Sequence, residues 1–223
     1  MDSLHRLEEL FAHFPGIGPR QARRFVYYLI NKPSSSIGEF IKLIEEVKKL
    51  ANECAKCHRL FIQNSKFPTS LAQSELRRAS QIPNSLCSIC SDPSRDQSIL
   101  MVIARDSDFE TIEKSGTYRG LYFILGGTIP ILDNEPEKRV RLKALLEYVS
   151  ELSADDSRLK EIILSLNTTP DGEHTAEIVK EAILNILNVK PIKISVLGRG
   201  LSTGAELEYA DGETIRNALK NRN

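Results

Sequence analysis

The chain has 223 residues, enough for one large domain or two to three small ones. Of these, 41% are hydrophobic and 27% are charged, a composition typical of globular proteins. Its 30 basic residues balance its 30 acidic residues, and no apolar run approaches the roughly 18 residues that a membrane span needs. The first twenty residues lack a signal-peptide pattern. We therefore expect a cytoplasmic protein with no membrane partner.

The charges are unevenly spread along the chain. Residues 1–95 contain 14 Lys and Arg against 9 Asp and Glu, whereas residues 96–223 contain 16 against 21. Such asymmetry hints that residues 1–95 bind an anion. Charge balance alone bears on steering and solubility rather than fold, and a solvated surface explains five charges more simply.

The first 52 residues predict a helical domain. Leu and Phe residues recur at helical spacing, with Asp2 or Ser3 as the cap of the first helix. Pro19 suits the first position of a second helix, and Ser36 can cap a third. The expected helices cover residues 2–12, 19–30 and roughly 37–52.

A glycine-built turn, FPGIGPRQARRF, joins the first two helices. Gly16 and Gly18 permit positive φ and close approach of a ligand to the backbone, and the start of the next helix offers free N–H groups to a phosphate. Arg20, Arg23 and Arg24 stand beside it. The pattern resembles the helix-hairpin-helix motif, which grips the DNA backbone. A tight helical corner with ordinary surface arginines fits these twelve residues equally well.

Two C-x-x-C pairs lie in the segment 53–95, and the four cysteines are Cys54, Cys57, Cys87 and Cys90. Four thiolates complete a closed tetrahedral zinc site, which predicts one structural Zn²⁺ per chain. His58 is a competing ligand, and buried or redox-active thiols are the alternative. The long insertion between the pairs, 58–86, is rich in basic residues that could contact phosphates, although a solvated loop is the simpler interpretation. A short helix is expected over 69–79.

From residue 99 onward, short apolar runs alternate with helical stretches, which predicts a mainly parallel α/β sheet covered on both faces. The expected strands are 99–103, 121–125, 161–166 and 192–197. The expected helices lie near 107–115, 135–152 and 173–188, and a last helix ends the chain.

Two acidic clusters follow strands of this sheet. Asp106 and Asp108 come after the first, and Asp171 and Glu173 after the third. Ligands bind at the carboxyl ends of parallel strands, and neighbouring carboxylates can hold Mg²⁺. Acidic residues are equally favoured at helix N-termini. We prefer the helix-terminal interpretation for the first cluster and leave both open for the second.

Taken together, five stretches give the sequence a specific resemblance to a known family. In order and spacing, FPGIGPRQARRFVYYL, the cysteine pair leading into CSICSDPSRD, EKSGTYRGLYFILGG, NTTPDGEHTA and GLSTGAELEYADGETIRNAL resemble the RecR family of bacterial recombination mediators. The resemblance implies a multidomain α plus α/β fold. Its parts would be a helix-hairpin-helix domain over 1–52, a four-cysteine zinc module over 53–95, a Toprim domain over 96–197 and a C-terminal extension over 198–223.

The resemblance also implies function. Family members are not regarded as enzymes; they form ring-like homo-oligomers, so a dimer or tetramer is expected, and they bind single- and double-stranded DNA without sequence preference at the nucleoid. They act with RecO, and in many bacteria RecF, to load RecA onto single-stranded DNA. Three sets of residues carry over. These are the zinc ligands Cys54, Cys57, Cys87 and Cys90, the DNA-binding Gly16, Gly18, Arg20, Arg23 and Arg24, and the Toprim acidic pair Asp171 and Glu173.

Two departures from the family pattern stand out. The loop between the cysteine pairs is greatly expanded. Ala104 stands where Toprim enzymes have the glutamate that holds Mg²⁺ with the acidic pair, so a Mg²⁺-dependent nuclease or topoisomerase is the competing hypothesis rather than the leading one. Tyr118 and Tyr122 could serve such an enzyme as nucleophiles, but packing explains them more simply. A protein-binding adaptor is a third hypothesis.

Overall fold

The computed structural model describes residues 2–62, 86–133, 135–154, 159–187, 192–201, 204 and 206–221. They form two compact units: a helical unit, residues 2–51 with Ile62, and an α/β unit, residues 52–61 with the described residues from 86 to 221. The short helix expected over 69–79 and most of the 58–86 insertion lie outside the described residues. Within the described parts, no helix has both the length and the apolar character required to cross a bilayer.

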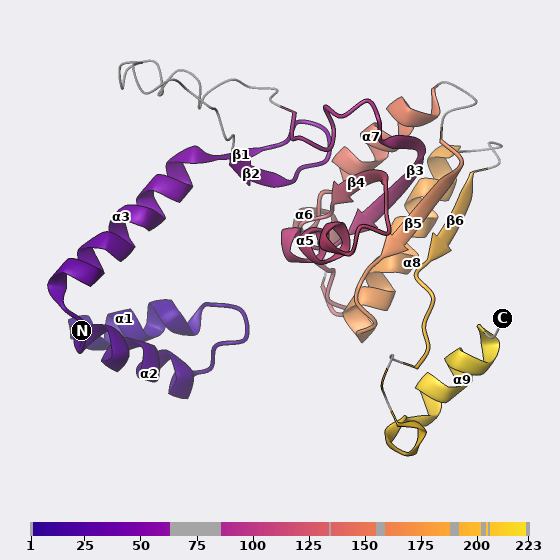
Figure 1. The fold of residues 1–223 in the computed structure, drawn as a ribbon. Coiled ribbons are helices and arrows are strands. Elements are labelled where there is room, and N and C mark those ends of the chain that lie inside the picture. Colours follow the sequence, from indigo (N-terminus) through magenta and orange to yellow (C-terminus); the bar gives the residue numbers. More distant parts are fainter. Residues whose placement is uncertain are drawn as a thin grey trace, which may run out of the picture. The chain divides into compact units, whose positions relative to one another are not determined.

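The helical unit contains α1 (Ser3–Ala12), α2 (Pro19–Ile30) and α3 (Ser34–Leu50) (Figure 1). Asp2 is the N-cap of α1 and its carboxylate accepts the N–H of Leu4. Pro19 occupies the first position of α2, as predicted. The predicted cap of α3 is wrong: the helix begins at Ser34, and Ser36 lies inside it because the N–H groups of Ser36 and Ile37 already donate to the Pro33 carbonyl.

The first two helices pack through one face of α2. Ala22 and Val26, one turn apart, are completely buried. The ring of Phe25 lies 5.8 Å from that of Phe11 in α1, and Phe11 in turn contacts Phe14 of the connecting turn at 5.5 Å. With its apolar face against α1, α2 presents its arginines to solvent.

The α/β unit is built on four parallel strands in the order β4-β3-β5-β6 (Figure 1). The strands are β3 (Asp96–Ile103), β4 (Gly120–Ile124), β5 (Glu161–Ser165) and β6 (Lys193–Val196). Each predicted strand is present, and the parallel sheet is confirmed. Two short strands, β1 (Ala51–Glu53) and β2 (Leu60–Ile62), pair separately on either side of the first cysteine pair.

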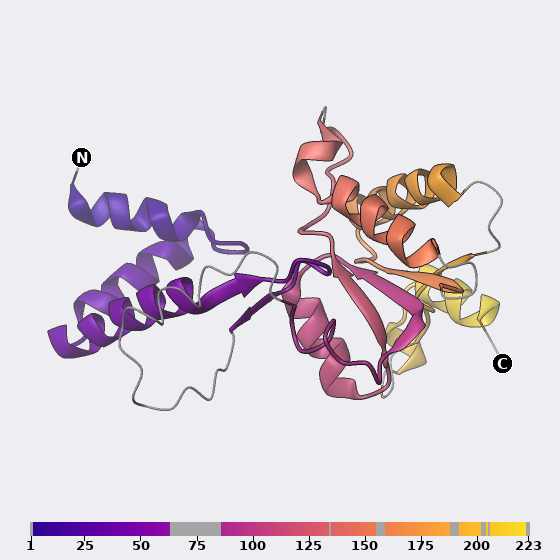
Figure 2. The same ribbon diagram turned by 90° about the horizontal axis from the view of Figure 1, so that it is seen from above.

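Helices cover both faces of this sheet (Figure 2). On one face, Leu100 and Val102 of β3 pack with α7 (Leu142–Ser153) and α8 (Pro170–Leu187). On the other face, Met101 and Ile103 pack with α5 (Asp106–Ser115) and the cysteines. This alternation follows from the two-residue period of a strand.

The helix expected over 135–152 is instead two helices, α6 (Pro136–Arg139) and α7. Val140 adopts an extended conformation between them and is buried in the core. The N–H of Arg141 donates to the Leu125 carbonyl at 2.8 Å, a long-range bond that replaces a helical one.

The described C-terminal residues form a 3₁₀ turn, η1 (Leu207–Tyr209), and α9 (Gly212–Lys220). Asp211 caps α9 by accepting the N–H groups of Glu213 and Thr214. The side chain of Asn221 donates to the Arg199 carbonyl at 2.6 Å, which fastens the end of α9 to the segment after β6.

Candidate metal and nucleic-acid binding sites

The four predicted cysteines come together in the α/β unit. Their sulfur atoms all lie within 4.8 Å of one another, and the Sγ atoms of Cys57 and Cys87 are 3.5 Å apart. Cys54, Cys57 and Cys87 are buried and Cys90 is half-buried. Because a zinc–thiolate bond is about 2.3 Å long, a tetrahedral zinc site has sulfurs about 3.8 Å apart. The cluster therefore has the donor set and spacing for one metal ion.

The crowding of these thiols perturbs their ionisation. Hydrogen bonds from Cys57, and then from Cys87 and Cys90, lower the pKa of Cys54. The hydrogen bond to Cys54 and burial raise the pKa of Cys57. Neighbouring thiols thus cannot all ionise on their own, whereas a bound divalent cation stabilises every thiolate at once. The electrostatics of the cluster fit a metal centre.

His58, the competing ligand, has a different role. It has a positive φ of 59°, and its Nδ1 atom lies 2.7 Å from the Glu53 carboxylate. Its ring lies 5.3 Å from that of Phe123 in β4. The same Glu53 carboxylate is 3.2 Å from the Arg141 guanidinium at the start of α7. His58 thus belongs to a polar link between the cysteine turn and the sheet.

The cysteine turn also covers the edge of the sheet at β4. The Cys57 carbonyl accepts the N–H of Ile124 at 2.8 Å, so the turn takes up a hydrogen bond that an edge strand leaves free. Cys54, Cys57 and Cys87 share one buried cluster with Met101 and Tyr122. The cysteine cluster and the sheet are therefore one packed structure.

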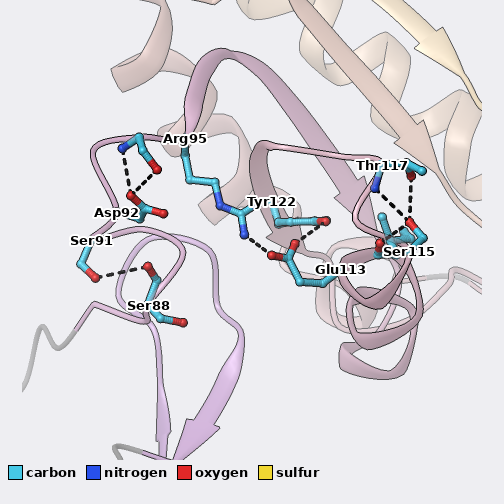
Figure 3. Close-up of polar contacts among 10 residues, drawn as sticks. Ser88, Ser91, Asp92, Arg95, Glu113, Ser115, Thr117 and Tyr122 are labelled. Carbon is cyan, nitrogen blue, oxygen red and sulfur yellow. Dashed lines mark hydrogen bonds and ion pairs between the residues drawn. The ribbon is translucent and has the colours of Figure 1, made fainter.

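A second polar network connects the segment that follows Cys90 to α5 and β4 (Figure 3). The Arg95 guanidinium pairs with the Glu113 carboxylate of α5, which also accepts the Tyr122 hydroxyl at 2.9 Å. Burial, and then the hydrogen bond to Glu113, raise the pKa of Tyr122. Asp92, between Cys90 and Arg95, accepts the N–H and hydroxyl of Ser94. No local pattern in the sequence predicts this network, because its members lie on segments distant in the chain.

In the helical unit, the predicted glycine turn leads into an exposed basic surface. Gly16 has a positive φ of 76°, whereas Gly18 is extended and is the N-cap of α2. Nothing lies within 4 Å of where a Cβ would be on either glycine, so the backbone there is open to a ligand. Arg20, Arg23 and Arg24 are exposed on α2, and Arg23 pairs with Glu8 of α1 at 3.2 Å.

The carboxylates after the first strand of the main sheet are engaged within the protein. Asp108 accepts the Arg105 N–H at 3.0 Å at the start of α5, and Asp106 accepts the Leu60 N–H at 2.8 Å. Both lie in the first turn of α5, where the helix dipole favours acidic residues. The helix-terminal interpretation fits both contacts.

The acidic pair Asp171 and Glu173 lies in the first turn of α8. Asp171 accepts the Ile131 N–H at 3.2 Å, and Glu173 pairs with Arg199 at 2.6 Å. Ala104, at the end of β3, is completely buried, and its carbonyl accepts the N–H of Gly126. The structure therefore places no carboxylate at residue 104 and gives each member of the acidic pair a partner within the protein.

A parallel sheet with an acidic pair after its third strand, joined to a four-cysteine cluster, defines a Toprim protein with an associated metal module. Residues 98–198 match the family model for the Toprim domain, and residues 200–223 match the one for the RecR C-terminal region.

Whole-chain comparisons agree with these matches. A protein from Bifidobacterium adolescentis is 33% identical over 99% of this chain and 95% of the relative. Proteins from Lactococcus lactis and Lactobacillus acidophilus are 32% and 31% identical over 99% and 97% of this chain, which cover 96% and 94% of those relatives. All three are named Recombination protein RecR. The chain belongs to the RecR family.

Proposed function

We propose that this protein is a non-catalytic, DNA-binding mediator of recombinational repair. Its relatives are recombination proteins by name. The observation that carries the proposal is the open glycine turn followed by three exposed arginines on α2. In this role the protein acts with RecO, and with RecF where the organism has it, to load RecA onto single-stranded DNA.

The start of α2 is suited to phosphate rather than to a base edge. Gly18 supplies no side-chain cap, so the first N–H groups of α2 remain available to an anion. The helix dipole adds partial positive charge there, and Arg20, Arg23 and Arg24 can neutralise neighbouring phosphates. Binding through phosphates is independent of sequence and strongly dependent on salt.

The cysteine cluster holds one structural Zn²⁺ in this proposal. The ion supplies stability to a segment that buries few apolar side chains of its own, and four thiolates leave no position for a reacting water. Elemental analysis should find about one zinc per chain. A metal-free chain that remains stably folded would count against the assignment.

Self-association is the next part of the proposal. Half-exposed apolar side chains follow one another along α3. They are Phe40, Ile41, Leu43, Ile44 and Val47, each about half exposed. An apolar groove of about 720 Å³ runs between this helix and the other two, with Phe11, Phe25 and Phe40 in its lining. Apolar surface of this kind is typical of protein contacts. A ring-like homo-oligomer, a dimer or tetramer, would cover the apolar side chains of α3.

The proposal of a non-catalytic role rests on the carboxyl edge of the sheet. A Mg²⁺-dependent nuclease needs free carboxylates, but Asp171 and Glu173 are engaged within the protein and residue 104 is alanine. A plasmid cleavage and relaxation assay with Mg²⁺ tests this directly. Turnover that is lost in Asp171→Ala would establish the enzyme instead.

The DNA-binding proposal is tested by charge reversal. The variant Arg20→Glu, Arg23→Glu, Arg24→Glu should bind DNA at least about tenfold more weakly at moderate salt, because it removes the contacts with phosphates. Each lost contact should also reduce the salt dependence of binding. Lys42→Glu, Lys48→Glu, Lys49→Glu is the matched control, with the same charge change on exposed residues of α3. Unchanged binding by the folded arginine variant, or equal loss in the control, would contradict the hairpin assignment.

A further inference from the structure

The exposed face of α2 carries two kinds of side chain in succession. Arg20, Arg23 and Arg24 occupy its first two turns, and Tyr27 and Tyr28 occupy the next. The spacings of three and four residues put them on one side of the helix. Since each residue advances the helix by 1.5 Å, Tyr27 lies about 10 Å along the axis from Arg20.

These residues line a common groove of about 630 Å³, which Asn31 and Lys32 complete at the end of the helix. Tyr27 and Tyr28 are large aromatic side chains that remain 51% and 59% exposed. The Lys32 ammonium lies 4.5 Å from the centroid of the Tyr28 ring. This cation–π contact restrains the orientation of the ring, which remains exposed to solvent. The groove therefore combines cationic groups with exposed aromatic rings.

Arginines alone do not distinguish one strand from two, because both forms of DNA present phosphates. Aromatic rings can distinguish single-stranded from double-stranded DNA, since the bases of a duplex stack on one another whereas a single strand has base faces free to stack on a ring. Proteins that hold single strands combine a cationic groove with aromatic rings on which bases stack, and this stacking tolerates any sequence. The groove on α2 contains both components within about two and a half turns of helix.

We propose that Tyr27 and Tyr28 form a stacking platform for unpaired bases, which makes the α2 groove selective for single-stranded DNA. This inference rests on the proposed function, since the arginines supply the phosphate grip. A strand that runs along α2 places its backbone at the arginines and its bases on the two rings. Strand selectivity then resides in the tyrosines, and overall affinity in the arginines.

The test compares oligothymidylate, a duplex of the same length, and an abasic strand by fluorescence anisotropy at one salt concentration. Tyr27→Ala, Tyr28→Ala should weaken single-strand binding about tenfold and change duplex binding less than about twofold. The wild-type protein should bind the abasic strand as weakly as the double variant binds the intact one. Tyr27→Phe, Tyr28→Phe keeps both rings and should retain single-strand affinity. Tyr209→Ala removes a tyrosine that is 80% exposed in the other unit, and it should have no effect.

Three results would overturn the inference. They are no loss in the double alanine variant, equal loss on single strand and duplex, and a loss that coincides with a lower mass in solution. The last would make the tyrosines a contact between copies of the chain. The proposed function fails separately, if the wild-type protein binds neither form of DNA. If the arginine variant loses both forms while the tyrosine variant loses none, only the stacking inference fails.

Discussion

The network of Arg95, Glu113 and Tyr122 should couple the metal module to the sheet, and a double-mutant cycle can measure it (Figure 3). Arg95 follows the second cysteine pair, Glu113 lies on α5 and Tyr122 lies on β4. The perturbations are Arg95→Met, which keeps the aliphatic stem, and Tyr122→Phe, which removes only the hydroxyl. Both act on the same carboxylate.

The exposure of the carboxylate sets the magnitude. The Arg95 side chain is 11% exposed and that of Glu113 is 32% exposed, so loss of the guanidinium leaves a charge that water only partly solvates. Breaking a fully buried pair costs about 3–5 kcal/mol and an exposed one under about 1 kcal/mol, which places Arg95→Met near 2 kcal/mol. Tyr122→Phe should cost about 1 kcal/mol. Because the two partners bind the two oxygens of one carboxylate, the two changes should deviate from additivity by at least about 0.5 kcal/mol.

Urea unfolding of the full chain, followed by circular dichroism, measures these free energies. With a slope near 2 kcal/mol per molar urea, the midpoint of Arg95→Met should fall by about 1 M. A metal-binding dye should also detect release of the ion at a lower urea concentration. Lys114→Met on the same helix is the matched control, because the Lys114–Glu110 pair is exposed and should contribute under about 0.5 kcal/mol. Additive effects, or equal effects of Arg95→Met and Lys114→Met, would refute the coupling.

Two further predictions test local geometry. Gly16→Ala should destabilise the helical unit by about 1 kcal/mol, because alanine disfavours the positive φ of 76°, whereas Gly38→Ala inside α3 should not destabilise it, since alanine is the better helix former; thermal unfolding distinguishes them, and equal effects would contradict the turn. Thr175→Val should cost about 1–3 kcal/mol in urea unfolding, because the buried Thr175 hydroxyl accepts the Ile129 N–H at 2.8 Å and valine leaves that donor unsatisfied. A neutral Thr175→Val would argue that water reaches this backbone group.

Local signals in the sequence predicted much of the fold. The bounds of α2 agree at both ends, because Pro19 marks its start and its apolar spacing continues to Ile30. The strands were recognisable because each is a short apolar run, as expected for a parallel sheet buried on both faces. The cysteine cluster was recognisable from spacing, since C-x-x-C constrains two sulfurs to one side of an ion.

Predictions were wrong where a distant contact outweighed local preference. Residues 135–152 have helical character throughout, but burial of Val140 and the bond from Arg141 to Leu125 interrupt the helix. Ser36 is a good cap by residue type, yet α3 begins before it, because the Pro33 carbonyl already accepts the N–H groups of Ser36 and Ile37. The pairing of Arg95 with Glu113 depends on the packing of α5 against the sheet, and neither residue signals it alone.

The acidic pair shows why the type of a residue does not determine its role. A carboxylate at the start of a helix can bind a metal, interact with the dipole or hold another segment. Asp171 holds another segment, since its carboxylate accepts the Ile131 N–H. Four residues further along α8, the Thr175 hydroxyl accepts the Ile129 N–H. Two side chains on successive turns of α8 thus bind alternate N–H groups of the loop after β4. This arrangement favours positioning of the loop over metal chemistry, and with alanine at residue 104 it agrees with the non-catalytic role that we propose.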